Sequence, residues 1–139
     1  TFAPEHFARV RQVDTMKRKQ FVKGINQIAQ EGAIQIFQEF NTGMEEIIVG
    51  VVGVLQFDVL KYRLQIERSS CPRHENLPYE YIRWIENEEN DLYKLTGTSD
   101  RKKVKDLKGR PLLLFVNEWS IRMTIDRNDG LKLTEFGRS

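Results

Sequence analysis

The most constraining feature of the sequence is a run of nine residues, 47–55, that holds only apolar side chains and the glycines Gly50 and Gly53. A membrane-spanning helix needs about 20 apolar residues, so this run is too short to cross a bilayer. Residues 46–52, which include the first part of this run, predict a strand at the centre of a sheet, buried on both faces. Gly53 is expected to end that strand.

The segments before and after this strand predict alternating strands and helices. Residues 7–13 alternate as in a strand, and Asp14 or Thr15 can cap a helix that runs from Met16 to Gly32. A strand over 33–40, a turn at 41–43, a helix over 54–66 and a strand over 70–77 follow. The two helices each carry one apolar stripe, made of Phe21, Ile25, Ile28 and Ala29 in the first and Phe57, Leu60 and Leu64 in the second.

This order of elements is that of a split βαβ, ferredoxin-like unit. Pro72 indicates that its fourth strand is an edge strand or contains a bulge. Beyond it we expect strands over 79–85, 102–107, 112–116 and 131–136, a short helix within 86–97, and a helix capped by Asn117. The strands 102–107 and 112–116 could pair across a turn at 108–110 that contains Gly109. The predicted fold class is α+β, in which a ferredoxin-like half (1–78) is extended by a C-terminal α/β block (79–139).

Charge is strongly segregated along the chain, although the net charge is only +2. Residues 1–25 hold six basic side chains against two acidic ones, and residues 101–111 hold six against one. Residues 75–100 hold seven acidic side chains against two basic ones. The two basic segments are candidates for contact with phosphates, and solvated surface is the alternative for each.

The residues alone indicate no catalytic or metal site. The sequence lacks a P-loop, and Gly50 and Gly53 suit a tight turn from strand to helix. Cys71 and His74 lack the further ligands of a zinc site, and a single cysteine allows no disulfide within the chain. The acidic residues 86–91 suit the solvated start of a helix better than a general acid and base. The central strand has no aromatic side chain for base stacking, which argues against an RNA-recognition sheet.

Three stretches resemble one family. The sequence KRKQFVKGI at 17–25 leads into EGAIQ at 31–35, and IVGVVGVLQFDVL at 48–60 follows. They closely resemble the C-terminal domain of the bacterial peptide chain release factor 3 family, translational GTPases related to elongation factor G. The residues that carry the motifs are Gly32, Gly50, Gly53, Leu55, Gln56 and Phe57, with Asn117 and Trp119 further on. Residues 68–72 depart from the family pattern of a glycine turn and an apolar strand.

The resemblance implies a single C-terminal domain, residues 1–139, of a longer cytoplasmic protein. Its preceding GTPase and β-barrel domains would bind GTP and magnesium, while this domain would be non-catalytic and need no cofactor. It would dock on ribosomal RNA and ribosomal proteins and couple the other domains, so that the protein helps remove stop-codon-reading release factors. No membrane or DNA contact is expected. A start at Thr1 instead of Met suits an excised domain.

Candidate ribosome contacts rest on charge alone. They are Arg9, Arg11, Lys17, Arg18, Lys19, Lys23, Arg101, Lys102, Lys103 and Lys105. Apolar residues left bare on one face would instead mark packing against the other domains. Two alternatives stay open: a free-standing ferredoxin-like module that binds a small ligand or a protein, and a small metal or thiol enzyme built on Cys71.

Overall fold

The structure is a computed structural model that describes residues 3–68, 73–87 and 100–135. The strands are β1 (His6–Arg11), β2 (Gln35–Gln38), β3 (Glu46–Val51), β4 (Arg73–Leu77), β5 (Tyr81–Ile85), β6 (Arg101–Asp106), β7 (Pro111–Phe115) and β8 (Leu133–Thr134). The helices are η1 (Thr15–Lys17), α1 (Arg18–Gln30), α2 (Leu55–Arg68) and α3 (Glu118–Arg127). The predicted α+β class is confirmed. Most of the helix expected within 86–97 lies outside the described residues.

The first half has the predicted ferredoxin-like arrangement. Its strands lie in the order β4-β1-β3-β2, all antiparallel, so β3 is central and β4 is an edge strand. Side chains from β1, β2 and β3 pack against α1 and α2 on one face of the sheet. The predicted stripes are confirmed, since Phe21, Ile25 and Ile28 of α1 and Phe57, Leu60 and Leu64 of α2 are all buried.

Local signals explain where α1 begins and ends. The Asp14 carboxylate accepts a hydrogen bond of 3.0 Å from the Met16 N–H, which caps η1 directly before α1. Gly32 follows the helix with φ of +82°, a conformation that favours glycine. Both positions agree with the sequence prediction.

The second half is also antiparallel, with strand order β6-β7-β5-β8. The predicted pairing of β6 with β7 is confirmed, and Gly109 in their turn has φ of +82°. Buried Asp106 anchors this hairpin, because its carboxylate accepts from the backbone N–H groups of Lys108 and Arg110, from Arg110 Nε and from Trp84 Nε1. Asn117 caps α3, as predicted, in a reciprocal pair with Ser120.

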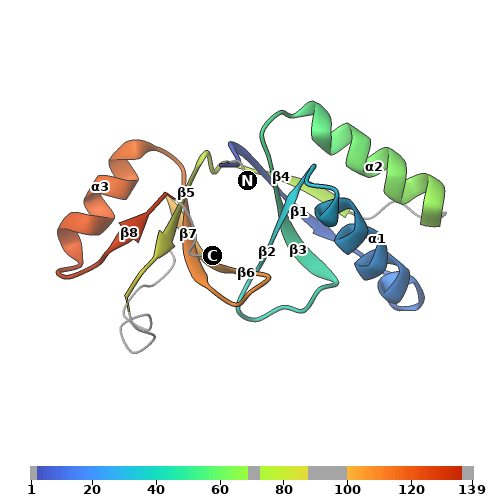
Figure 1. Cartoon of the computed structure of the whole chain (residues 1–139), viewed down its shortest axis with the longest axis horizontal. Coiled ribbons are helices and arrows are strands. Elements are labelled where there is room, and N and C mark those ends of the chain that lie inside the picture. The colour runs from blue at the N-terminus through green and yellow to red at the C-terminus, as the bar shows by residue number, and fades with distance from the viewer. Residues whose placement is uncertain (1–2, 69–72, 88–99, 136–139) are drawn as a thin grey trace.

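A pairing that the sequence did not predict joins the halves into one eight-stranded sheet, in which β2 lies beside β6. Phe7 of β1 and Ile82 of β5 share one core cluster, although four strands lie between β1 and β5. In a flat sheet those strands would be about 24 Å apart. The sheet must therefore curl around this central core. Figure 1 shows the two halves facing each other, with α1 and α2 outside one and α3 outside the other.

Candidate interaction surfaces

The turn before α2 contains the most specific family motif, and Gln56 organises it. Gln56 Oε1 accepts from the backbone N–H groups of Val52 (2.9 Å) and Gly53 (3.0 Å), while its Nε2 donates to the Ala33 carbonyl (2.9 Å). One side chain thus joins the end of β3 and the start of α2 to the segment that leads into β2. The predicted tight turn from strand to helix is therefore present after Val51, but Gly50 is not part of it, because this residue still pairs within β3.

Gly50 has a packing role in the same motif. A Cβ at this position would lie 2.9 Å from Pro4 Cβ and 3.1 Å from ring atoms of Phe7 and Phe37. Those distances are shorter than normal carbon contacts, so any larger residue would force the N-terminal segment or the aromatic pair to move. Phe57 of the motif is buried in the core under α2.

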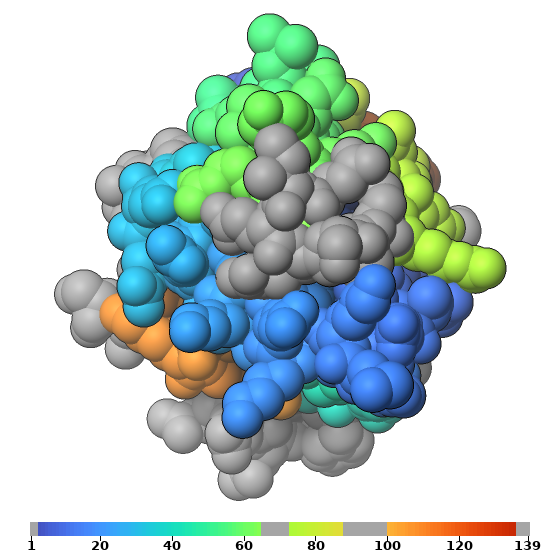
Figure 2. Space-filling view, turned by 90° about the vertical axis from the view of Figure 1, so that its right-hand side faces the viewer, coloured from blue at the N-terminus to red at the C-terminus, as the bar shows by residue number. Residues whose placement is uncertain are grey.

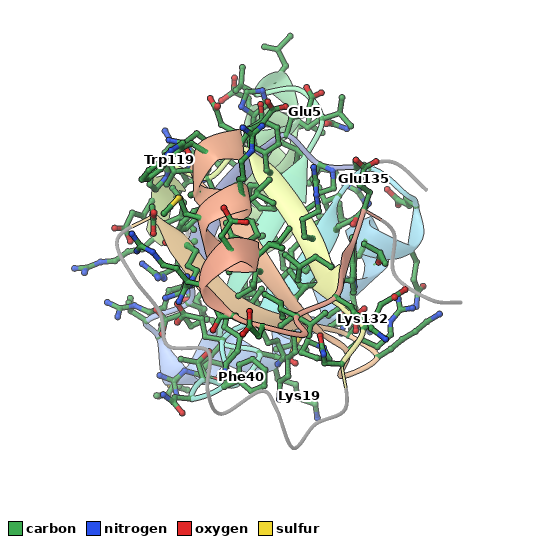
Figure 3. All side chains as sticks on the ribbon, turned by 90° about the vertical axis from the view of Figure 1, so that its left-hand side faces the viewer. Glu5, Lys19, Phe40, Trp119, Lys132 and Glu135 are labelled. Atoms are coloured by element: carbon green, nitrogen blue, oxygen red, sulfur yellow. The ribbon has the colours of Figure 1, made fainter. Side chains whose placement is uncertain are left out.

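Other motif residues lie at the surface. Leu55 is 74% exposed at the start of α2, and Trp119 is 62% exposed in the first turn of α3. Figure 3 shows Trp119 at one end of α3, and the opposite face of that helix contributes the buried Ile121. The fold does not require apolar side chains at these two exposed positions.

An apolar ridge follows the outer side of α2. It consists of the exposed residues Val52, Val54, Leu55, Val59 and Tyr62, whose exposed fractions run from 43% to 74%. Leu55, Val59 and Tyr62 are spaced four and three apart, so they form one stripe opposite the buried residues of the same helix. Figure 2 faces this layer and shows α2 (green) and α1 (blue) at the surface. Such a helix, apolar on both sides, is typical of one that packs against a second protein surface.

The outer side of α1, in contrast, is polar. Arg18, Lys19 and Lys23 are exposed there, and Lys17 lies just before them in η1. Arg18 Nε donates to the Gln12 carbonyl at 3.5 Å, which ties one of these cations to the chain between β1 and η1. These predicted contact residues therefore lie together on one exposed stretch of the first half.

Arg9 and Lys102 lie in an internal ion cluster. Both bind Glu39 Oε1, Arg9 at 2.8 Å and Lys102 at 2.6 Å, and Arg9 also reaches Glu75 at 2.9 Å. Burial disfavours the charged form of Arg9 and by itself would lower its pKa. The hydrogen bonds from Arg9 to Glu39 and Glu75 outweigh burial, so the pKa of Arg9 is raised. Hydrogen bonds from Lys102 and Arg9 likewise outweigh burial and lower the pKa of Glu39. This cluster ties β6 to the first half.

The other cations of β6 lie on the opposite face of the strand, beside Phe40. Lys103 Nζ and Lys105 Nζ lie 5.3 Å and 5.8 Å from the centre of the Phe40 ring. Arg101, on the same side of the strand, donates to Thr124 Oγ1 of α3 at 2.9 Å. We call Phe40, Arg101, Lys103 and Lys105 the basic strip. Sequence reasoning found its cations but missed Phe40, because the β2–β6 pairing that brings them together is not visible in the sequence.

Two hollows flank β4. One of 410 Å³ is bordered by His6, Val54, Asp58, Lys61 and His74 among others, and it lies next to the apolar ridge through Val54. The second, of 360 Å³, lies over Arg9, Arg11, Glu46, Arg73 and Glu75. It holds the predicted contact residue Arg11 opposite Arg73 in the β1–β4 register.

The described residues contain no group of three or more His, Cys, Asp or Glu side chains that could hold a metal ion. Cys71, the basis of the metal or thiol alternative, lies outside the described residues. Within the described part of the chain, no helix is both long and apolar enough to span a membrane.

The structure is thus an α+β domain with a ferredoxin-like half. Residues 1–125 match the family described as "Class II release factor RF3, C-terminal domain". Because the match covers most of the sequence, the chain belongs to this family.

Curated relatives agree with that assignment. The chain is 44% identical over 131 residues to a protein named peptide chain release factor 3 from Symbiobacterium thermophilum, a match that covers 94% of this chain and 25% of the relative. It is 41% identical to proteins of the same name from Lactobacillus acidophilus and Listeria welshimeri, with 96% and 97% of this chain covered and 25% of each relative. The chain thus spans about a quarter of the length of these relatives.

Proposed function

We propose that this chain is the ribosome-docking and interdomain-coupling domain of a translation termination GTPase. In this proposal a preceding domain binds GTP and magnesium, and the whole protein promotes the dissociation of stop-codon-reading release factors from the ribosome. The domain itself carries out no catalysis. Family membership supports the termination context, and the surfaces described above suggest how the domain would act.

The observation that carries the coupling role is the apolar ridge on α2. An exposed stripe of this kind loses its contact with water when a second surface packs on it, and each large side chain then contributes about 1.5–3 kcal/mol. The occupant that we propose is the part of the protein that precedes this domain in the relatives, since the matching family is a C-terminal domain. The N-terminal segment of this chain supports that choice, because Glu5 N–H bonds to the Val51 carbonyl directly beside the ridge.

The docking role rests on charge. The cations of η1 and α1 form one basic region and the basic strip forms another, and each suits contact with the phosphates of ribosomal RNA. Arg9 and Lys102 are less suited to this role, since both bind Glu39 within the protein. We therefore assign RNA contact to Lys17, Arg18, Lys19, Lys23, Lys103 and Lys105.

The coupling role is tested with Leu55→Ser combined with Tyr62→Ser in the full-length protein. We expect this variant to bind GTP normally but to lose ribosome-stimulated release-factor dissociation at least 10-fold, because the nucleotide state no longer changes the position of this domain. The matched control is Gln27→Ser with Gln30→Ser, two exposed polar residues of α1 that are assigned no contact. Normal dissociation activity in the ridge variant would exclude the coupling role of this face.

The docking role is tested by co-sedimentation of the full-length protein with ribosomes over a series of salt concentrations. Reversal of charge at Lys17, Arg18 and Lys19 should reduce the pelleted fraction and flatten its dependence on salt. Pelleting that stays unchanged across salt concentrations would contradict an electrostatic contact. The upstream coding sequence gives a further check, since a P-loop in the same reading frame excludes the free-standing module.

A further inference from the structure

The basic strip has a composition that the core of the protein does not explain. Phe40 lies two residues after the end of β2 and is 45% exposed, and it belongs to none of the three core clusters. Figure 3 shows it at the edge of the molecule remote from Trp119. The ring instead lies under Lys103 Nζ and Lys105 Nζ, so an aromatic face and two cations occur together at the surface.

The geometry of the sheet explains how the strip stays accessible. In the β2–β6 register Gln38 lies opposite Lys105, which places Phe40 across from Lys103. Side chains on this face of the first half pack under α1 and α2, and those of the second half pack under α3. The strands β2 and β6, which lead to and carry the strip, adjoin each other where the two halves of the sheet meet (Figure 1).

The two faces of β6 carry different sets of side chains. The carboxylates of Glu39 and Asp106 lie on the face opposite the strip, where they bind Lys102 and Arg110. Along β6, Arg101, Lys103 and Lys105 alternate with Lys102, Val104 and Asp106. The first three side chains therefore share the face of Phe40. The strip thus combines one aromatic ring with three cations.

We propose that the basic strip binds an unpaired nucleotide of RNA, with its base stacked on Phe40 and its flanking phosphates at Lys103 and Lys105. This inference rests on the proposed ribosomal role and names the kind of RNA that the domain contacts. Both ammonium groups lie over the ring, within 6 Å of its centre, so a stacking base would displace them from the ring toward its own flanking phosphates. Paired bases are shielded by their neighbours, so a duplex cannot use the ring in this way.

An acidic protein segment is the rival occupant, since carboxylates also bind lysines. The aromatic ring favours RNA, because a nucleobase offers a flat face to stack on while the phosphates reach the lysines. The choice between the two becomes an outcome of the test.

The test uses a fluorescein-labelled single-stranded RNA of ten adenosines and an RNA duplex of the same length, titrated with the 139-residue chain and followed by fluorescence anisotropy. We expect tighter binding of the single strand. Phe40→Ala and Phe40→Leu should each weaken it about 10-fold, whereas Phe40→Tyr keeps the stacking surface and should retain affinity. Lys103→Gln with Lys105→Gln should reduce the slope of log K against log salt by about 1.4, the value for two phosphates on a single strand.

Two controls separate the strip from general effects. Trp119→Ala removes another exposed aromatic side chain, and Lys19→Gln with Lys23→Gln removes two exposed cations elsewhere. The first should leave affinity unchanged, and the second should leave the preference for single strands unchanged. Circular dichroism checks that every variant is folded.

Retained affinity in Phe40→Ala, retained affinity in Phe40→Leu, or equal binding of duplex and single strand would each overturn the proposal. A Phe40→Ala protein that loses ribosome co-sedimentation but keeps oligonucleotide affinity would assign the strip to a protein partner instead. Failure of the proposed function is distinguishable, because then the unsubstituted full-length protein would not co-sediment with ribosomes at all.

Discussion

The two helices on the first half of the sheet, α1 and α2, are alike on the side that faces the sheet and differ on the side that faces outward. Both α1 and α2 bury an apolar stripe in one shared core. Outside, α1 presents Lys19 and Lys23, while α2 presents Leu55, Val59 and Tyr62. Since the fold is satisfied by the inner stripes alone, the outer sides carry information about partners. A polar side indicates solvent or phosphates, and an apolar side indicates a second protein surface.

The largest expected effect separates the two sides of α2. Leu60 is 2% exposed and its neighbour Val59 is 55% exposed. Leu60→Ala should lower the free energy of unfolding by about 2–5 kcal/mol, because it leaves a cavity in the shared core. Val59→Ala should change it by less than about 0.5 kcal/mol. Urea denaturation followed by circular dichroism measures both.

Ile25→Ala on the inner side of α1 provides the parallel control and should behave like Leu60→Ala. If Val59→Ala cost as much as Leu60→Ala, the ridge would be packed within this chain, and the contrast between the outer sides of the helices would disappear.

A smaller effect concerns how each helix is anchored. The α1 segment begins after a capped 3-10 turn, whereas the start of α2 depends on the three hydrogen bonds of Gln56. Gln56→Ala should cost about 1–2 kcal/mol of unfolding free energy, since the bonds are partly exposed and water replaces some of them. Gln27→Ala, exposed on α1, is the matched control and should be nearly neutral. Equal effects of the two substitutions in urea denaturation would rule out an anchoring role for Gln56.

The buried sides of the helices and strands could be predicted from the sequence, because burial of one side makes apolar residues recur at a regular spacing along each element. The stripes of α1 and α2 and the central position of β3 follow from which residues are apolar and how they are spaced, while Pro72 indicated the edge position of β4. The Asp14 and Asn117 caps and the turn at Gly109 follow from local chemistry, which needs no knowledge of the rest of the fold. Elements governed by local rules were therefore predictable.

The candidate site was less predictable, because it depends on contacts distant in sequence. The β2–β6 pairing is set by the curl of the sheet around the central core, and only that pairing brings Phe40 to Lys103. Charge alone could not distinguish Lys102, which binds Glu39 within the protein, from its neighbour Lys103 beside Phe40. Apolar residues left bare on one face were expected in general terms, but their place on the outer side of α2 was not predicted.

The smallest expected effect concerns the ion pair between Arg63 of α2 and Glu31, the residue after α1, which links these two neighbouring helices. Arg63 Nη2 donates to Glu31 Oε1 at 3.1 Å. This hydrogen bonding lowers the pKa of Glu31, an exposed group. A carboxyl whose pKa is lower in the folded state stabilises the protein above its unfolded pKa, and that contribution is lost as the pH falls through the folded value. Arg63→Gln should therefore shift the urea midpoint slightly at pH 7, and the shift should shrink as the pH falls below about 4.3.

Arg122→Gln, at an exposed arginine of α3, is the control and should show no such pH dependence. A shift for Arg63→Gln that persists in acid would mean that Arg63 acts through packing of its side chain on α1. The two helices would then be joined by more than charge.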